Sequence, residues 1–80
     1  MFYTYILKSK LVRRHYIGST GDLKERLSEH NAGRVESTKP YRPWILTYYE
    51  AHLTKTLARK AELFYKTGQG RKQIKRKLGE

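Results

Sequence analysis

Apolar and aromatic residues gather in three short segments that predict β-strands. Residues 2–7, "FYTYIL", are aromatic or β-branched at almost every position, and residues 15–19, "HYIGS", follow after a polar interval. Residues 44–51, "WILTYYEA", have the same character. Such composition is typical of strands, in which successive side chains point to opposite faces of a sheet.

The first two predicted strands lie close enough in sequence to form a hairpin. The polar and basic residues 8–13 would form its loop. We expect Tyr5 to lie opposite Tyr16 and Tyr3 opposite Gly18, with both tyrosines of the first pair on one face. A slip of one residue would move those two tyrosines to opposite faces, so the register matters for any site built from them.

A first helix is predicted after the hairpin. Asp22 is followed three residues later by Glu25, which resembles a capping box at a helix start. Leu23 and Leu27 form a short apolar stripe along one face of this helix. Gly33 is expected to end it in the left-handed conformation.

Two further helices are predicted beyond residue 51. The first begins at Thr54 or Thr56, and residues 67–70, "TGQG", are expected to break it. A short final helix is predicted over residues 71–78, where two apolar residues stand four apart. The buried face of the longer helix is expected to consist of Leu57, Ala58, Ala61, Phe64 and Tyr65.

The predicted order of elements is β-β-α-β-α-α, which indicates an α+β fold with a small, largely antiparallel three-stranded sheet flanked by helices. With 80 residues, the chain is expected to form one domain over residues 1–80. It has no cysteine, which excludes a disulfide framework and suits a reducing compartment. We see no signal-peptide pattern and no apolar run long enough for a membrane span, so we expect a cytoplasmic protein with no membrane partner.

The charge of the chain points to a polyanionic partner. Eighteen Lys and Arg residues against seven Asp and Glu residues give a formal net charge of +11. Because such an excess repels itself, it usually serves binding to a polyanion, and nucleic acid is the foremost candidate. The expected phosphate contacts, for which a solvated helix face is the alternative, are Lys66, Arg71, Lys72, Lys75, Arg76 and Lys77.

Several residues that could take part in catalysis or binding lie in the predicted hairpin and helices. Gly18 stands inside a strand, where glycine often marks a close approach. Arg26 and His30 are neighbours on one edge of the first helix, although a surface ion pair and a helix-end contact would also explain them. Glu62 lies on the flank of the second helix, where an ion pair with Lys66 is the simpler explanation.

Taken together, these residues resemble the GIY-YIG nuclease superfamily. The first motif is represented by "TYI" around Tyr5 and the second is intact as "YIG" at residues 16–18. The arginine follows eight residues after this motif, a histidine four residues later, and a glutamate comes in a later helix. The resemblance covers nearly the whole chain. The matching set is Tyr5, Tyr16, Gly18, Arg26, His30 and Glu62.

The resemblance implies metal-dependent endonuclease activity on DNA or structured nucleic acid. Glu62 would hold one divalent ion, Mg²⁺ or Mn²⁺, and Arg26 would bind the developing charge on the phosphate. Tyr16 or Tyr5 would position or deprotonate the attacking water, with His30 as the alternative base. The glycine of the "YIG" motif would let the phosphate approach the backbone closely.

The chain departs from the family pattern at two places. No asparagine follows Glu62, and Ser19 stands where many repair-type members have a lysine. A binding module that keeps the nuclease fold without catalysis is therefore the alternative function. DNA is the expected partner in either case, and we expect a monomer or a weak homodimer.

Overall fold

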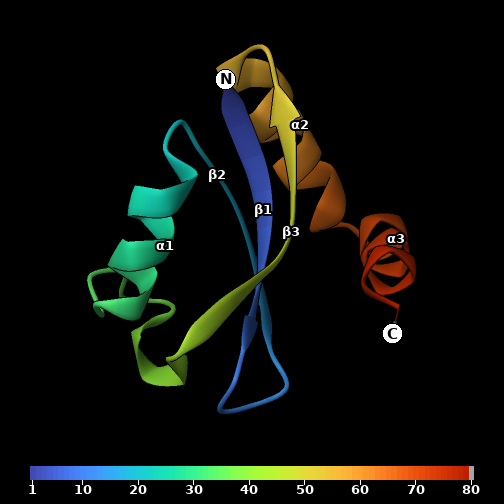
Figure 1. Cartoon of the computed structure of the whole chain (residues 1–80). Coiled ribbons are helices and arrows are strands. Elements are labelled where there is room, and N and C mark those ends of the chain that lie inside the picture. The colour runs from blue at the N-terminus through green and yellow to red at the C-terminus, as the bar shows by residue number, and fades with distance from the viewer. Residues whose placement is uncertain (80) are drawn as a thin grey trace.

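A three-stranded antiparallel sheet organises the computed structural model, which describes residues 1–79 (Figure 1). Strand β1 (Phe2–Ser9) lies in the middle, between β2 (His15–Thr20) and β3 (Trp44–His52). Both neighbours pair antiparallel with β1. This arrangement confirms the predicted α+β fold and leaves β2 as an edge strand.

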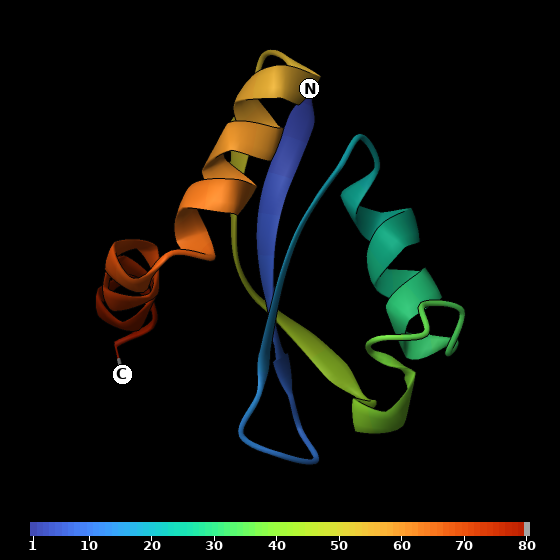
Figure 2. The same ribbon diagram turned by 180° about the vertical axis from the view of Figure 1, so that it is seen from behind.

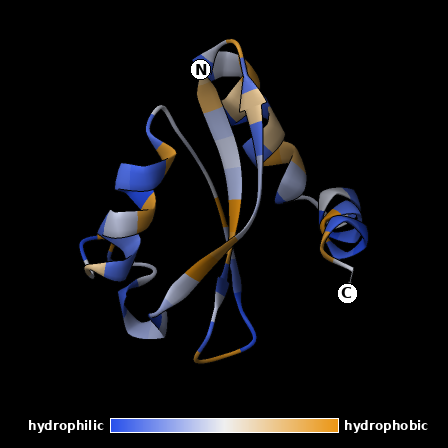
Figure 3. Ribbon diagram, in the orientation of Figure 1, coloured by the Kyte–Doolittle hydropathy of each residue, from blue (hydrophilic) through white to orange (hydrophobic). Residues whose placement is uncertain are grey.

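The helices lie on both sides of the sheet. Helix α1 (Leu23–Asn31) lies on one side, and α2 (Lys55–Tyr65) with α3 (Gly68–Leu78) lies on the other, as Figures 1 and 2 show. A short 3₁₀ turn (Lys39–Tyr41) precedes β3. Figure 3 shows that α1 and α3 are mostly hydrophilic. No helix among residues 1–79 is both long and apolar enough to span a membrane.

The hairpin register differs from the prediction by two residues. Tyr5 pairs with Gly18, and Tyr16 pairs with Leu7. The predicted pairing was wrong because β1 continues to Ser9, whose hydroxyl accepts hydrogen bonds from two backbone amides of the following turn. A shift of two keeps every side chain on its predicted face. Tyr5 and Tyr16 therefore still share one face, with ring centroids 6.3 Å apart.

The ends of α1 follow the predicted signals. The Asp22 carboxylate accepts a hydrogen bond from the Glu25 amide at 3.0 Å. Gly33 has a positive φ of 79° just after the helix, a conformation that favours glycine. These two signals set the length of α1 and so decide where His30, in its last turn, lies.

Each face of the sheet has its own apolar cluster. On the α1 side, Tyr5, Leu7 and Trp44 are buried together. On the α2 and α3 side, Ile6 packs with Tyr65 and Ile74. A chain this small thus divides a modest core between two layers of helices.

The buried face of α2 is only partly as predicted. Ala58 and Tyr65 are buried, but Leu57 and Phe64 are exposed, with 47% and 39% of their surfaces accessible. Glu62, expected on the flank, occupies the middle of the contact face and is 5% exposed. The contact face follows the positions i, i+4 and i+7 from Ala58, which leaves the two larger apolar side chains at its edges.

The second helix ends at Tyr65, before residues 67–70 as predicted, but the final helix already begins at Gly68 instead of residue 71. The Thr67 hydroxyl accepts from the Gly70 amide at 3.1 Å and caps the new helix. Any Cβ on Gly70 would overlap the carbonyl oxygen of Phe64. The glycine therefore allows α3 to start directly against the last turn of α2, and α3 places its basic residues beside β2.

Candidate active site

A buried hydrogen bond between Tyr5 on β1 and His30 on α1 forms the centre of the site. The Tyr5 hydroxyl lies 2.9 Å from Nε2 of His30, and Nδ1 of the same ring lies 2.8 Å from the Thr38 hydroxyl oxygen. The Thr38 hydroxyl donates to the carbonyl of Val35 at 3.3 Å. It therefore accepts from Nδ1–H of His30, which leaves Nε2 to accept the Tyr5 proton.

Both members of this pair stay neutral near pH 7. Burial lowers the pKa of His30 to about 4, and the positive charge of Arg26 acts in the same direction. Burial raises the pKa of Tyr5 to about 12, although hydrogen bonding to the Arg26 guanidinium opposes this change. The imidazole is fully buried with both nitrogens engaged, so its visible role is to orient the Tyr5 hydroxyl.

Thr38 was not among the predicted site residues. Its carbonyl accepts from the Trp44 indole nitrogen at 2.9 Å, and the Asn31 side chain bonds the backbone of Trp44 through both its oxygen and its nitrogen. These bonds join the end of α1 to the start of β3 and bring Thr38 to His30. The sequence shows only a threonine in a polar loop with two prolines, which carries no local signal for this contact.

Gly18 makes room for the Tyr5 hydroxyl. A Cβ at this position would lie 2.5 Å from the Tyr5 oxygen and 3.1 Å from Cε2 of Tyr16. The close approach expected at Gly18 is therefore present, and it is made by the hydroxyl of Tyr5. Tyr16 itself is half-buried, and its ring centroid lies 4.8 Å from that of His30.

Arg26 brings a positive charge to the exposed side of this cluster. Its Nη1 atom donates to Glu29 at 3.1 Å, and its side chain is 35% exposed. The guanidinium also reaches the Tyr5 hydroxyl. The surface ion pair considered from the sequence is thus present together with the contact to Tyr5, and the same guanidinium can be approached from solvent.

Glu62 approaches the edge strand from the opposite side of the sheet. Its Oε1 atom accepts from the Ser19 hydroxyl at 2.7 Å. Its Oε2 atom accepts from Lys66 at 2.7 Å and from Arg59 at 2.9 Å. Burial would raise the pKa of this carboxyl, but the bonds from Lys66, Ser19 and Arg59 outweigh it and hold the pKa below its usual range. Glu62 is therefore ionised at neutral pH.

The sequence-predicted residues thus form two groups on either side of β2. Tyr5, Tyr16, Arg26 and His30 lie together on the side of the sheet that α1 covers, whereas Glu62 belongs to the buried face of α2. Figures 1 and 2 show these two helices on opposite sides of the sheet. Ser19 of β2 links Glu62 to the edge strand, so the departure from lysine here has a structural role.

The donor set suits a weakly held hard cation. Among residues 1–79 no cluster of three or more His, Asp or Glu side chains could enclose a metal ion. Mg²⁺ commonly binds through one or two carboxylates and keeps water or substrate phosphate as its other ligands. A single ionised carboxylate such as Glu62 fits that mode.

The six cations predicted to contact phosphate have different surroundings. Lys66 bonds Glu62, and the Nζ atom of Lys77 lies 5.1 Å from the centre of the Tyr48 ring. Arg71 and Lys75 line a pocket beside β2. Lys72 and Arg76 are exposed and do not line that pocket.

Comparison with known proteins gives one family. The model of the GIY-YIG catalytic domain matches residues 1–76. Three relatives from Streptococcus pyogenes are each 40% identical over 72 residues, which cover 89% of this chain and 77% of each relative. They are the UPF0213 proteins SpyM3_1077 of serotype M3, MGAS10750_Spy1258 of serotype M4 and SpyM50708 of serotype M5. No solved structure matches the chain significantly.

Proposed function

Because the chain belongs to the GIY-YIG catalytic domain family, as its motifs predicted, we propose that it is a divalent-metal-dependent endonuclease acting on nucleic acid, with DNA as the expected substrate. The observation that carries this proposal is the presence of a cationic and an anionic side chain on the two sides of β2. The Arg26 guanidinium on one side can bind an anion, and the ionised Glu62 on the other can bind a cation. A cationic side chain and a bound metal ion together stabilise the negative charge that develops during phosphodiester hydrolysis.

Glu62 would hold the divalent ion, Mg²⁺ or Mn²⁺. The carboxylate of Glu62 would thereby place Lewis-acid chemistry beside the phosphate, which would polarise a phosphoryl oxygen and stabilise the leaving oxygen. Arg59 and Lys66 now neutralise the carboxylate, but both side chains are largely exposed. They could therefore form ion pairs with substrate phosphates instead, which would leave the carboxylate of Glu62 available to bind the metal ion.

The remaining residues divide into contact and positioning roles. Arg26 binds the non-bridging oxygens of the phosphate, where its planar fork suits two parallel hydrogen bonds. Tyr16, the more accessible of the two tyrosines, orients or deprotonates the attacking water. The Tyr5 hydroxyl stays protonated, donates its hydrogen bond to His30 and contacts the Arg26 guanidinium, so Tyr5 and His30 act as positioning residues.

A binding module without catalysis is the second candidate. Both oxygens of Glu62 are already bonded to Ser19, Arg59 and Lys66, and residues 63–80 contain no asparagine. A nuclease fold can also be retained for binding alone, since fold does not determine function. This reading requires the same basic surface and gives no role to a metal.

An activity assay with a matched arginine variant separates the two candidates. Supercoiled plasmid, branched duplex, single-stranded DNA and RNA are each incubated with the protein in Mg²⁺, Mn²⁺ or EDTA. We expect metal-dependent cleavage of at least one substrate, lost in Arg26→Ala and kept in Arg34→Ala, which removes an exposed arginine just beyond α1. Binding of equal strength in Mg²⁺ and EDTA, with no cleavage, would support the binding module instead.

A further inference from the structure

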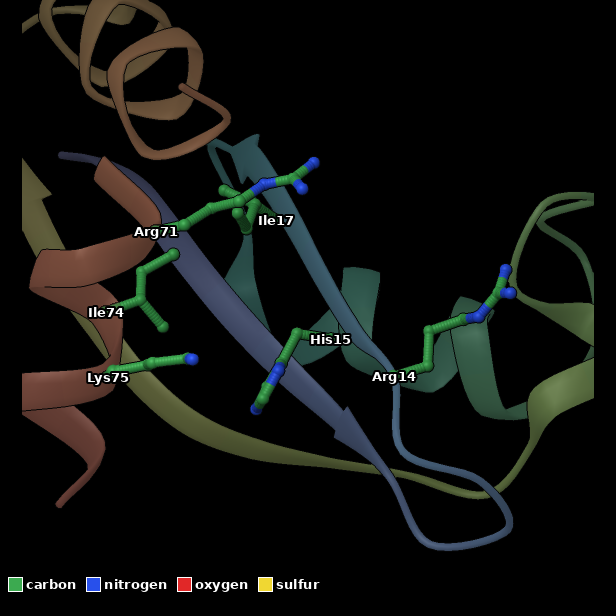
Figure 4. Close-up of a pocket in the computed structure, with 6 residues that line it drawn as sticks. All are labelled: Arg14, His15, Ile17, Arg71, Ile74 and Lys75. Atoms are coloured by element: carbon green, nitrogen blue, oxygen red, sulfur yellow. The ribbon is translucent and has the colours of Figure 1, made fainter. Parts of the chain in front are cut away.

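A basic pocket of about 530 Å³ lies between β2 and α3, away from the Tyr5–His30 pair (Figure 4). α3 contributes two cations and one isoleucine, and β2 contributes a histidine and one isoleucine, with an arginine just before the strand. The lining residues are Arg14, His15, Ile17, Arg71, Ile74 and Lys75. Within residues 1–79 no acidic side chain lines it, and the roles given to Tyr5, Tyr16, Arg26, His30 and Glu62 do not require this pocket.

Basic side chains predominate around the pocket. Figure 4 shows Lys75 and His15 pointing toward each other, while Arg71 extends past Ile17. Arg14 points away, and its guanidinium carbon lies 4.1 Å from the centre of the Tyr41 ring. The other two lining cations, Arg71 and Lys75, come from α3, and in Figure 4 the Arg71 guanidinium points away from the Lys75 ammonium.

These two cations repel each other in the absence of a ligand. Arg71 and Lys75 are four residues apart on one helix, where like charges are destabilising. Neither forms an ion pair with any residue in the described range 1–79. An anion placed between them would relieve this repulsion, and the low dielectric of a concave surface would strengthen its binding.

The floor of the pocket is apolar. Ile74 is 5% exposed and Ile17 is half-buried, and both belong to the cluster beneath α3. An inorganic anion would gain nothing from these side chains. A sugar attached to a phosphate would cover them, so the pocket matches a sugar-phosphate group better than a free ion.

The pocket lies on the same face of β2 as the carboxylate of Glu62. His15, Ile17 and Ser19 alternate along that strand, and Ser19 bonds Glu62. Four residues of strand span about 13 Å. A DNA strand carries one phosphate for about each 3.4 Å of duplex axis, so this separation corresponds to a few nucleotides.

We propose that this pocket binds the sugar-phosphate backbone of the nucleic-acid strand a few nucleotides from the bond to be cut. Arg71 and Lys75 contact the phosphate, and Ile17 with Ile74 packs against the sugar. The position of the cut rests on the proposed nuclease function, whereas the binding of backbone in this pocket does not. Lys72 and Arg76, on the same helix outside the pocket, contribute only long-range attraction.

Two double variants with the same loss of charge test the pocket. Arg71→Ala with Lys75→Ala removes the pair inside it, and Lys72→Ala with Arg76→Ala removes an identically spaced pair outside it. Binding of a short fluorescent DNA duplex is measured in EDTA over a series of salt concentrations. Each phosphate contact contributes about −0.9 to the slope of log K against log salt concentration.

We expect the pocket variant to reduce the steepness of the slope by about 1.8 and to bind DNA at least tenfold more weakly, whereas the control changes far less. Equal effects of the two variants, or none from the pocket pair, would overturn the proposal. Competition by inorganic phosphate as strong as that of a short oligonucleotide would show a free-anion site instead. If the two double variants differ in slope but the parent cleaves no substrate, the proposed binding in the pocket stands and only the proposed nuclease function is rejected.

A tethered probe tests where the strand lies. Because the chain has no cysteine, Lys75→Cys and Lys72→Cys each provide a single attachment point for an iron–EDTA reagent. With Lys75→Cys we expect a narrow set of breaks a few nucleotides from the enzyme's own cut. The Lys72→Cys control should give weaker and more dispersed breaks, and the same pattern from both would contradict the proposed path.

Discussion

A side chain on Gly18 would collide with the Tyr5 hydroxyl, since its Cβ would lie 2.5 Å from that oxygen. The two residues are direct partners in the β1–β2 ladder. Because Gly18 has no side chain, Tyr5 can lie close against it, and the Tyr5 hydroxyl thereby reaches His30 across the face of the sheet. The glycine of the "YIG" motif is therefore required by a tyrosine of the neighbouring strand.

We predict that Gly18→Ala destabilises the fold by about 1–3 kcal/mol, because the added methyl group overpacks a filled site. It should also abolish cleavage, since Tyr5 must leave His30. Urea unfolding measures the first effect and plasmid cleavage the second. Gly21→Ala is the control, because its Cβ would meet only Phe2 at 3.5 Å. An alanine variant at position 18 with parental stability would refute this packing.

Thr38→Val should cost about 1–3 kcal/mol, because it leaves the buried Nδ1–H of His30 without an acceptor. Thr38→Ser keeps the hydroxyl and should retain most of the stability. Nitrogen NMR of the imidazole gives a second measurement. The parent should show the Nδ1–H tautomer, and a clear Nε2–H signature in the parent would contradict the assigned hydrogen bonds.

The lowered pKa of His30 predicts that the folded protein becomes less stable as the pH falls. In the unfolded chain a histidine takes up a proton below about pH 6.5, but in the folded protein His30 does so only near pH 4. The unfolded state therefore binds more protons in this window, and the free energy of unfolding falls as pH drops from about 6.5 to about 4. The full loss is on the order of 3 kcal/mol.

Urea unfolding between pH 7 and pH 4 tests this dependence, with His30→Gln as the matched variant. The slope of the free energy of unfolding against pH should be much smaller in the variant across the same window. An identical slope in both proteins would show that other groups cause the acid sensitivity. Below this window, protonation of Glu50 and Glu62, whose pKa values are also lowered, should destabilise the fold further.

A second polar cluster links β3 to α2. Glu50 accepts hydrogen bonds from the hydroxyls of Tyr48 and Tyr65 and contacts His52 at 2.8 Å. Burial would raise the pKa of Glu50, but these bonds outweigh it and lower the pKa. Glu50→Gln should therefore cost about 1–3 kcal/mol by weakening charge-assisted bonds. The exposed Glu36→Gln is the control in urea unfolding, and equal stability of the two variants would contradict this role.

Periodicity and turn signals were sufficient for the element order and the faces of the sheet. The hairpin register was not predictable in the same way, because it depends on the hydroxyl of Ser9 bonding the following turn. The start of α3 was missed because Gly70 resembles a helix breaker in sequence, although it serves the close approach to α2. In both cases a tertiary contact overrides a local preference.

The candidate site shows the same division. Motif spacing identified the residues of the site, but it did not predict that Glu62 is buried. A glutamate four residues before a lysine on a helix usually forms a surface ion pair. Three donors from β2 and α2 stabilise this carboxylate inside the contact face. Thr38 was missed because only the folded loop brings it to His30.

The central claim is that Glu62 holds the catalytic metal ion. The most direct measurement is the rate of plasmid cleavage against Mg²⁺ concentration for the parent, for Glu62→Gln and for the exposed control Glu25→Gln. We predict saturable, Mg²⁺-dependent cleavage by the parent and the control, and at least a hundredfold slower cleavage by a folded Glu62→Gln protein at every concentration. Cleavage by Glu62→Gln at the parental rate, with the same dependence on Mg²⁺, would contradict the claim.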